Sequence, residues 1–254
     1  MGKFKKLGLS EEIIKVITEM GFESPTEIQK EAIPRLLTED RDMIGLAQTG
    51  TGKTAAFGLP LLEKIDPSEN YTQGLILAPT RELGKQIAEQ LNIFSKYLTK
   101  VNVLAVYGGA SIMDQIRALK KPQHIIIATP GRLIDLIKRK AVKLEQLQYL
   151  VLDEADEMLN MGFKDELEEI LSFTPEEKLT WLFSATMPGH IKKIVKNYME
   201  DPIDIRVNTT EEVNKNIKHL YTKVKNKDKM EALTRFIDIY EDIRAVVFLS
   251  LIHI

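Results

Sequence analysis

At residues 47–54 the chain reads Ala47-Gln-Thr-Gly-Thr-Gly-Lys-Thr54. This stretch lies between a short apolar run, Met43 to Leu46, and a helical pattern that begins near Lys53. A strand, a glycine-rich loop and a helix in that order predict a phosphate-binding loop. Because Gly50 and Gly52 lack a Cβ, the backbone can turn several N–H groups towards one anion. We therefore expect this loop to cradle phosphate.

Two side chains at the end of the loop have a predicted role in the same site. Lys53 supplies an ammonium group for the outer phosphates, and the hydroxyl of Thr54 is placed to bind Mg²⁺. The N-terminus of the following helix adds partial positive charge. Ala47 occupies the position of the first glycine of the general pattern, so the match is one residue short. A glycine-rich turn that merely contains Lys and Thr is the alternative.

Length and composition restrict the possible classes of protein. The 254 residues, 44% hydrophobic and 28% charged, are typical of a globular chain with one full domain and part of another. Neither an apolar run of about 18 residues nor a leader is found, so we expect a cytoplasmic protein that does not bind membranes. The chain has no cysteine and four scattered histidines, which predicts no disulfide and no thiolate or histidine metal site. A net charge of −2 means that nucleic acid would have to bind a local patch.

Short apolar runs alternate with amphipathic helical patterns along most of the chain. The runs expected to be strands are 43–46, 74–78, 101–107, 124–128, 149–152, 180–183 and 203–207. The helices are expected at 10–18, 26–37, from 53 onward, 80–97, 112–119, 131–138, 163–171 and 189–198. This alternation predicts an α/β fold, a mostly parallel sheet with helices on both faces. Ligands of such sheets bind at the carboxyl ends of the strands.

Acidic residues follow the strand expected at 149–152. Asp153 would emerge at the phosphate site, where a carboxylate together with Thr54 and phosphate oxygens suits Mg²⁺. Glu154 is one residue nearer the terminal phosphate and could orient and deprotonate a water molecule. The alternative is a helix N-terminus that favours acidic residues, because Glu154, Asp156 and Glu157 open a short helical pattern.

Two arginines and two upstream residues have more than one interpretation. Arg81 and Arg132 head helices at strand ends and could hold sugar-phosphate oxygens, or they could only cap helices and form surface ion pairs. Gln29 could pair with an adenine edge and the ring of Phe4 could stack on the base. Taken alone, the two segments favour Phe4 as a core anchor and Gln29 as a solvated helix residue over these nucleotide-binding roles. The basic pairs along the chain are usually solvated surface.

Taken together, these segments closely resemble the DEAD-box family of ATP-dependent RNA helicases from Phe4 to about Val207. The motifs that carry the resemblance occur in unbroken order: Phe4, Gly21-Phe22, Pro25-Thr26, Ile28-Gln29, A-Q-T-G-T-G-K-T, P-T-R-E-L, Gly-Gly, T-P-G-R, D-E-A-D and S-A-T. In this family the loop does begin with Ala. The resemblance implies a RecA-like P-loop domain that uses ATP and Mg²⁺ and opens short RNA duplexes locally.

The resemblance also implies a role for each motif residue. The implied catalytic residues are Glu154, Lys53 and Asp153, and the implied metal ligands are Thr54 and Asp153. The implied ATP-binding residues are Phe4, Phe22, Thr26, Gln29, Gln48, Thr49, Gly50, Thr51, Gly52, Lys53 and Thr54, of which Gln29, Thr26 and a phenylalanine ring would read adenine. The implied contacts to the RNA backbone are Pro79, Thr80, Arg81, Gly108, Gly109, Thr129, Pro130, Gly131 and Arg132. Asp156, Ser184 and Thr186 would couple the nucleotide state to strand separation.

The remainder of the chain is expected to differ from a complete helicase. We expect a first domain over 1–208, a linker over 209–216 and the start of an incomplete second RecA-like domain over 217–248, with a helix at 228–240 and a strand at 244–248. Residues 249–254 match a translated transposase adaptor from DNA sequencing libraries, so our hypothesis is that they are not biological. Without the arginines of a second domain, this chain should hydrolyse ATP very weakly.

Two other functions remain open from the sequence. A P-loop ATPase that works on DNA would differ in not preferring RNA over DNA of the same sequence. A one-domain RNA-binding protein without enzymatic activity is the other alternative. A GTPase is disfavoured because no guanine-reading Asn-Lys-x-Asp segment is present.

Overall fold

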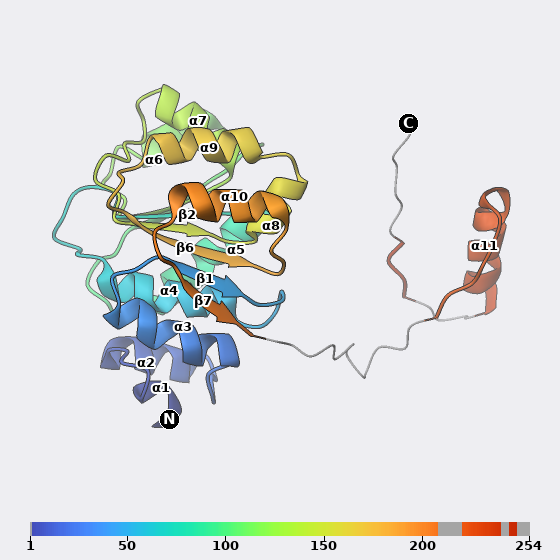
Figure 1. The fold of residues 1–254 in the computed structure, drawn as a ribbon, viewed down its shortest axis with the longest axis horizontal. Coiled ribbons are helices and arrows are strands. Elements are labelled where there is room, and N and C mark those ends of the chain that lie inside the picture. Colours follow the sequence, from blue (N-terminus) through green and yellow to red (C-terminus); the bar gives the residue numbers. More distant parts are fainter. Residues whose placement is uncertain (1, 208–219, 240–243, 248–254) are drawn as a thin grey trace. The chain divides into compact units, whose positions relative to one another are not determined.

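The computed structural model describes residues 2–207, 220–239 and 244–247 (Figure 1). The chain divides into two compact units, residues 1–209 and 210–254. In the first unit the described residues form one sheet of seven strands, all paired in parallel, in the order β3-β4-β2-β5-β6-β1-β7. The strands are β1 (Met43–Leu46), β2 (Gly74–Leu77), β3 (Val103–Val106), β4 (Ile125–Ala128), β5 (Tyr149–Leu152), β6 (Leu179–Ser184) and β7 (Ile203–Arg206).

Helices cover both faces of this sheet, as Figure 1 shows. They are α1 (Gly2–Lys5), α2 (Glu11–Glu19), α3 (Glu27–Thr38), α4 (Lys53–Lys64), α5 (Arg81–Phe94), α6 (Ile112–Ala118), α7 (Pro130–Lys138), α8 (Ala155–Asn160), α9 (Lys164–Ser172) and α10 (Gly189–Tyr198). The predicted α/β fold with a parallel sheet is confirmed. The short helix α1 was not predicted, and most of the expected strands are one to three residues too long.

In the strands other than the edge strand β7, alternate residues enter different cores. Met43 packs with α2, α3, α4 and α5 on one face, whereas its neighbour Ile44 packs with α7, α8, α9 and α10 on the other. Ile126 and Ile127 of β4 divide in the same way. Because side chains alternate along a strand, a strand buried on both faces must be apolar throughout. This is why the strands appear in the sequence as unbroken apolar runs.

Local sequence signals set several helix starts. Ser10 caps α2 by accepting a hydrogen bond from the Ile13 N–H at 3.4 Å. Thr26 and Gln29 form a capping box at the start of α3. Pro130 occupies the first turn of α7, where its missing N–H has no cost. Helix starts were therefore predictable to within about a residue.

The second unit contains a single-turn 3₁₀ helix η1 (Asn226–Asp228) and α11 (Lys229–Ile239) in its described residues. The helix expected at 228–240 is thus formed. The strand expected at 244–248 is not, because the described residues 244–247 have no regular structure. The expected linker at 209–216 and the hypothesised adaptor tail at 249–254 lie outside the described residues. Within the described ranges, no helix is both long and apolar enough to span a bilayer.

Candidate functional site

All the motif segments outside the upstream Gln29 segment lie at the carboxyl ends of strands, and the strand order divides them into two groups. The phosphate loop follows β1, Ser184 ends β6 and Asp153 follows β5, and these three strands are adjacent in the sheet. The segments predicted to contact RNA follow β2, β4 and β3, which are also adjacent. The carboxyl edge of the sheet therefore carries the segments predicted to bind the nucleotide beside the segments predicted to contact the RNA backbone.

The loop between β1 and α4 has the glycine geometry that a phosphate cradle requires. Gly50 and Gly52 have φ angles of +81° and +89°. A Cβ on Gly52 would lie 2.4 Å from the Gln29 Nε2, so no other residue fits there without displacing that amide. The Ala47 N–H donates to the Ser184 carbonyl at 3.0 Å, which fixes the start of the loop to β6. The Thr51 hydroxyl donates to the Gln48 carbonyl at 2.7 Å and closes the turn.

Lys53 is a buried cation without a hydrogen-bond partner in the described part of the chain. Its side chain is 6% exposed, and within the described residues its Nζ makes no hydrogen bond. An ammonium group taken out of water without compensation costs several kcal/mol. This cost of burial is expected where the partner of the ammonium group is a ligand. The N–H donors of Lys53 are then vacant in the free protein and face the anion when it binds. The position of Lys53 at the first turn of α4 directs this charge to the loop.

Asp153 is the matching buried anion. It is 2% exposed, and its Oδ1 accepts a hydrogen bond from the Glu154 N–H at 3.0 Å. Burial raises the pKa of this carboxyl from 3.8 to about 7, although the positive charge of Lys53 acts in the opposite direction. A bound cation would shift the carboxyl back to its charged form.

Glu154 stands between the strand end and the loop. It has left-handed backbone angles, φ 50° and ψ 50°, and is the residue before α8. A non-glycine residue pays a steric cost for this conformation. Its Oε1 accepts a hydrogen bond from the Thr49 hydroxyl at 3.4 Å, so the carboxylate lies beside the phosphate loop. The acidic first turn of α8, with Asp156 and Glu157, agrees with the alternative of a helix N-terminus, although the Glu154 side chain caps no N–H of α8. The catalytic role of Glu154 stays a prediction.

The residues present fit Mg²⁺ held jointly with phosphate. Asp153 and Thr54 are the available protein oxygens, and among the described residues no group of three or more acidic or histidine side chains could hold an ion alone. Mg²⁺ usually binds one or two carboxylates together with substrate phosphates and water. A single buried carboxylate beside an unpartnered lysine suits that arrangement.

Gln29 joins the upstream segment to the loop. It is 3% exposed, so the interpretation as a solvated helix residue is wrong. Its Oε1 accepts from the Thr26 N–H at 3.0 Å and its Nε2 donates to the Gly52 carbonyl at 3.1 Å. A primary amide has two donors and an acceptor with two lone pairs. One donor and one lone pair therefore remain for a ligand.

The two candidate stacking rings have different environments. Phe4 is 3% exposed and packs in the core, which agrees with its interpretation as a core anchor. Phe22 is half-buried, with its ring centroid 6.2 Å from that of Phe4 and 6.4 Å from that of Phe94. Phe22 is thus the ring with surface left for a base. Its role in stacking stays a prediction.

Asp156 links β6 to α8. Its Oδ2 accepts hydrogen bonds from the Thr186 N–H at 2.9 Å and from the Thr186 hydroxyl at 2.7 Å. Burial acts to raise the pKa of the Asp156 carboxyl, but hydrogen bonds, chiefly from Thr186, hold it below its usual value. The Ser184 hydroxyl donates to the Thr186 carbonyl at 2.7 Å. The three residues predicted to act in coupling are therefore in direct contact.

In the second half of the edge, Thr80 and Arg81 start α5. The Thr80 hydroxyl accepts from the Leu83 N–H at 3.2 Å, so this side chain is already used as a cap. Arg81 is exposed and its guanidinium lies 5.5 Å from the centroid of the Tyr107 ring. Lys85 lies 5.3 Å from the same ring. Tyr107 directly precedes Gly108-Gly109 and was not predicted as a site residue.

Arg132 contacts the loop that carries Gly108 and Gly109. Its guanidinium donates to the Gln115 Oε1 at 2.8 Å and to the Ala110 carbonyl at 3.1 Å, and Gln115 donates in turn to the Tyr107 carbonyl at 3.1 Å. Gln115 is 8% exposed and was missed. The available signal was an amide beside Ile112 and Ile116, on the apolar face of a helix. Three of the five guanidinium N–H groups of Arg132 are left for a ligand.

The remaining predicted residues are divided between surface and interior. Pro79 and Pro130 are buried, Gly108, Gly109 and Gly131 are exposed, and Thr129 is half-buried. Gly109 has a φ of +77°, and a Cβ there would lie 3.4 Å from the Arg81 guanidinium. The Thr129 side chain caps no N–H of α7. Exposed glycine backbone and a free hydroxyl are the groups that a sugar-phosphate chain can approach.

Comparison with known proteins identifies this arrangement. The model of the DEAD/DEAH box helicase family matches residues 26–194. The chain belongs to the DEAD/DEAH box helicase family. A DEAD-box protein from the hyperthermophile Methanococcus jannaschii has a similar crystal structure, with 40% identity and a TM-score of 0.78 over 92% of this chain and 63% of that one. The resemblance to DEAD-box proteins and the RecA-like fold are therefore confirmed.

The DEAD-box relatives are longer than this chain. It is 49% identical over 248 residues to the DEAD-box ATP-dependent RNA helicase CshA of Bacillus cereus. The matched region covers 98% of this chain and 47% of that relative. It is 50% identical over 248 residues to the ATP-dependent RNA helicase CshA of Listeria monocytogenes, with the same coverage. The chain thus spans about half the length of the curated relatives it matches.

Proposed function

We propose that residues 1–208 are the ATP-binding domain of an ATP-dependent RNA helicase, joined by residues 209–216 to the start of a second domain over 217–248. The observation that carries the proposal is the buried, unpartnered ammonium of Lys53 in a glycine loop, next to the buried carboxylate of Asp153. Family membership supports the use of ATP and RNA. A charge without a partner in the folded chain is best explained by a partner from outside it.

In this proposal each residue of the nucleotide half has one task. Lys53 and the backbone N–H groups of the loop hold the outer phosphates, and Thr54 and Asp153 hold Mg²⁺, which neutralises the developing charge on the phosphates. Glu154 orients the attacking water and takes its proton. Gln29, held by its bonds to Thr26 and Gly52, offers its free donor and lone pair to the adenine edge.

The other half of the edge holds one RNA strand by its backbone. The exposed guanidinium of Arg81, the remaining donors of Arg132 and the exposed glycines at 108, 109 and 131 contact phosphate and sugar groups. Such contacts carry no base specificity. Asp156, Ser184 and Thr186, which contact one another at the boundary with the nucleotide half, transmit the state of the nucleotide to strand separation.

Hydrolysis by the 254 residues alone should be slow. In the described part of the chain no arginine is hydrogen-bonded to the phosphate loop or paired with Asp153 or Glu154. An arginine that reaches the terminal phosphate is worth ~10³ to 10⁵ in rate in related phosphoryl-transfer enzymes. We therefore expect binding of ATP and RNA without efficient unwinding.

The first test is equilibrium binding of ATP, ADP and GTP to the chain in the presence of Mg²⁺. Adenine nucleotides should be preferred, and Gln29→Ala should lose that preference because the amide that faces the base is gone. If ATP and GTP bind alike to the unmodified chain, the loop binds phosphate without reading the base. RNA and DNA of one sequence, compared in the same assay, separate an RNA helicase from a DNA-directed ATPase.

A second test concerns Glu154. Glu154→Gln keeps the size of the side chain and removes its basicity, so Mg²⁺·ATP binding should be retained while single-turnover hydrolysis falls ~10²- to 10⁴-fold. Glu157→Gln is the matched control, because Glu157 is an exposed carboxylate in the first turn of α8, three residues from Glu154. Unchanged hydrolysis in Glu154→Gln would remove this residue from the role of base.

A further inference from the structure

A continuous groove runs along the amino ends of the strands, at the edge opposite the candidate site. It consists of three adjoining cavities of about 410, 560 and 720 Å³. The first and second share Glu145 and Gln146, and the second and third share five residues that include Asp40 and Lys178. Their lining segments precede β4, β2, β5, β6, β1 and β7, which is the order of these strands in the sheet.

One end of the groove is basic. Lys121, Lys140 and Lys143 line the first cavity, together with a single carboxylate, that of Glu145. All three lysines are exposed, and within the described ranges none has a carboxylate within ion-pairing distance. Three unpaired ammonium groups around one cavity produce a local positive potential on a chain whose net charge is negative.

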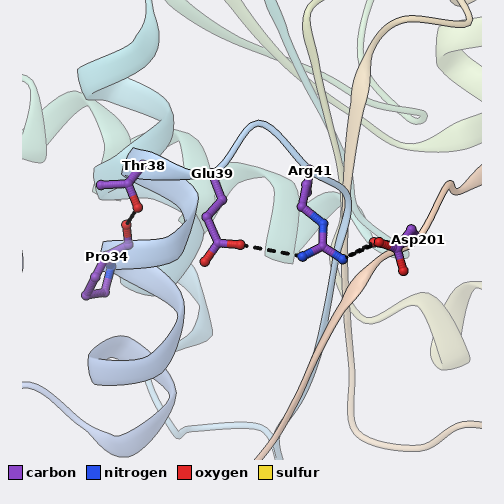
Figure 2. Close-up of polar contacts among 5 residues, drawn as sticks. All are labelled: Pro34, Thr38, Glu39, Arg41 and Asp201. Carbon is purple, nitrogen blue, oxygen red and sulfur yellow. Dashed lines mark hydrogen bonds and ion pairs between the residues drawn. The ribbon is translucent and has the colours of Figure 1, made fainter.

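The other end is acidic. The third cavity is lined by six carboxylates and only two cations. One of these cations, Arg41, is already paired with carboxylates of the protein itself. Figure 2 shows Arg41 between Glu39 and Asp201. The guanidinium nitrogens lie 3.7 Å from the Glu39 Oε2 and 2.6 Å from the Asp201 Oδ2. Four of the six carboxylates form no ion pair among the described residues: Asp42, which is buried and bonded to backbone N–H groups, and Glu176, Glu177 and Glu200. The groove therefore has opposite charge at its two ends.

Each end also carries a charged residue with left-handed backbone angles. Lys140 has a φ of +56° directly after α7, and Asp201 has a φ of +39° before β7. The position of Lys140 is one that glycine usually occupies at the end of a helix. A lysine with left-handed backbone angles costs roughly 1–2 kcal/mol in steric strain. This strain is understandable if the charge of the lysine binds a partner. Glu154, the proposed base, has the same kind of conformation.

We propose that this groove binds an extended, polar segment of a partner protein, with acidic side chains over the β4 and β2 end and basic side chains over the β1 and β7 end. Five strand spacings separate β4 from β7, which is about 24 Å at roughly 4.8 Å each. An extended chain covers this span with about seven residues. Tyr149, half-buried in the middle cavity, offers an apolar contact between the charged ends.

The charge distribution favours a polypeptide over a nucleic acid. A nucleic acid that follows the groove from the lysines would bring its phosphates against Glu176, Glu177 and Glu200, and like charges in contact are unfavourable. A peptide can reverse its charge along its length and a sugar-phosphate backbone cannot. The groove also lies at the opposite end of the strands from the proposed nucleotide and RNA contacts, so the proposal does not depend on them.

The test is fluorescence anisotropy on the full chain at low salt. The probe is a labelled peptide of three glutamates, a Gly-Ser-Gly spacer and three lysines, made in both chain directions. One direction should bind at least tenfold more tightly than a peptide of the same composition with alternating charges. The double variant Lys140→Glu, Lys143→Glu should lose this difference and should instead bind a peptide in which the glutamates are replaced by lysines.

The control is the double variant Lys192→Glu, Lys193→Glu, which changes the net charge equally on the exposed side of α10 and should bind like the unmodified chain. The replacement peptide makes the result independent of folding defects, because a misfolded variant would not gain affinity for it. Equal binding of block and alternating peptides, or an unchanged affinity in the Lys140, Lys143 variant, would overturn the proposal. Displacement of the bound peptide by an RNA oligonucleotide would assign the groove to RNA instead.

Discussion

Asp42 and Asp153 are buried aspartates at opposite edges of the same parallel sheet. Asp42, before β1, accepts hydrogen bonds from the Thr180 N–H at 2.6 Å and the Glu200 N–H at 2.8 Å. Asp153, after β5, accepts within the described part of the chain only from the adjacent Glu154 N–H. Burial raises the pKa of both carboxyls, but at Asp42 the two backbone donors oppose the shift. The same residue type is a structural clamp at one edge and an unsatisfied charge at the other.

Other buried polar groups follow the same division. At the amino edge, His124 Nδ1 accepts from the Asn102 N–H at 2.9 Å and its Nε2 lies 3.1 Å from the Glu69 carbonyl. Gln73 bonds through both ends of its amide to the backbone of Asp66. At the carboxyl edge, Lys53 has no partner among the described residues. The division is not complete, because Thr180 Oγ1 and Trp181 Nε1 of β6 also have no partner among the described residues. Lys53 is the one charged group of these three, which is why it indicates a ligand.

The largest expected effect comes from removing the unpartnered charge. Lys53→Met should lower Mg²⁺·ATP affinity at least ~100-fold, because charge-assisted hydrogen bonds to two phosphates are each worth about 1.5–3 kcal/mol. The nucleotide-free variant should nevertheless be about 1 kcal/mol more stable, because a buried ammonium group without a hydrogen-bond partner among the described residues has been removed. Isothermal titration and urea unfolding measure the two effects. A loss of stability equal to the loss of affinity would show that Lys53 is a structural residue.

The second-largest effect is expected at the amino edge of the sheet, where removing a satisfied carboxylate should change stability and not ATP affinity. Asp42→Ala leaves the buried Thr180 N–H and the Glu200 N–H without their acceptor, which should lower the free energy of unfolding by about 3 kcal/mol. ATP affinity of the folded fraction should not change. Asp201→Asn is the control, since the Arg41–Asp201 pair is exposed and such pairs contribute about 0–1 kcal/mol (Figure 2). Equal losses in the two variants would contradict the distinction between buried and exposed carboxylates.

The smallest effect is a dependence of stability on pH. The raised pKa of Asp153 means that the folded protein binds this proton more tightly than the unfolded chain does. Its contribution is therefore most favourable below the ordinary pKa of 3.8 and is lost as pH rises towards 7. Between pH 5 and 7 the nucleotide-free chain should lose about 1 kcal/mol per pH unit from this group, measured by urea unfolding. Asp153→Asn should remove that slope, and an unchanged slope would assign it to other groups.

The fold was predictable because its signals are local. Apolar runs such as Met43 to Leu46 must be strands buried on both faces, and Ser10 and Thr26 mark helix starts by their capping chemistry. The strand ends were less predictable, since hydrogen bonding to neighbours decides where a strand stops. The strand expected at 244–248 is wrong over 244–247 because apolar residues form a strand only when a neighbouring strand pairs with them.

The candidate site was predictable where one motif carries all of its geometry, as in the loop from Ala47 to Thr54. It was not predictable where the geometry is shared between distant segments. Gln115 holds Arg132 across 17 residues of sequence, and Gln29 reaches Gly52 across 23. Tyr107 gains its place beside Arg81 only because β3 and β2 both pair with β4. No local pattern indicates such contacts.

By itself the sequence determined the alternation of strands and helices, the phosphate loop and the residue types at each strand end, because these depend on periodicity and local backbone chemistry. Only the tertiary structure decided the strand order, which divides the carboxyl edge into the proposed nucleotide half and the proposed RNA half and brings Asp156 to Thr186. It also decided which buried charges are satisfied and assembled the groove from six separate segments. Both depend on contacts between residues that are far apart in the chain.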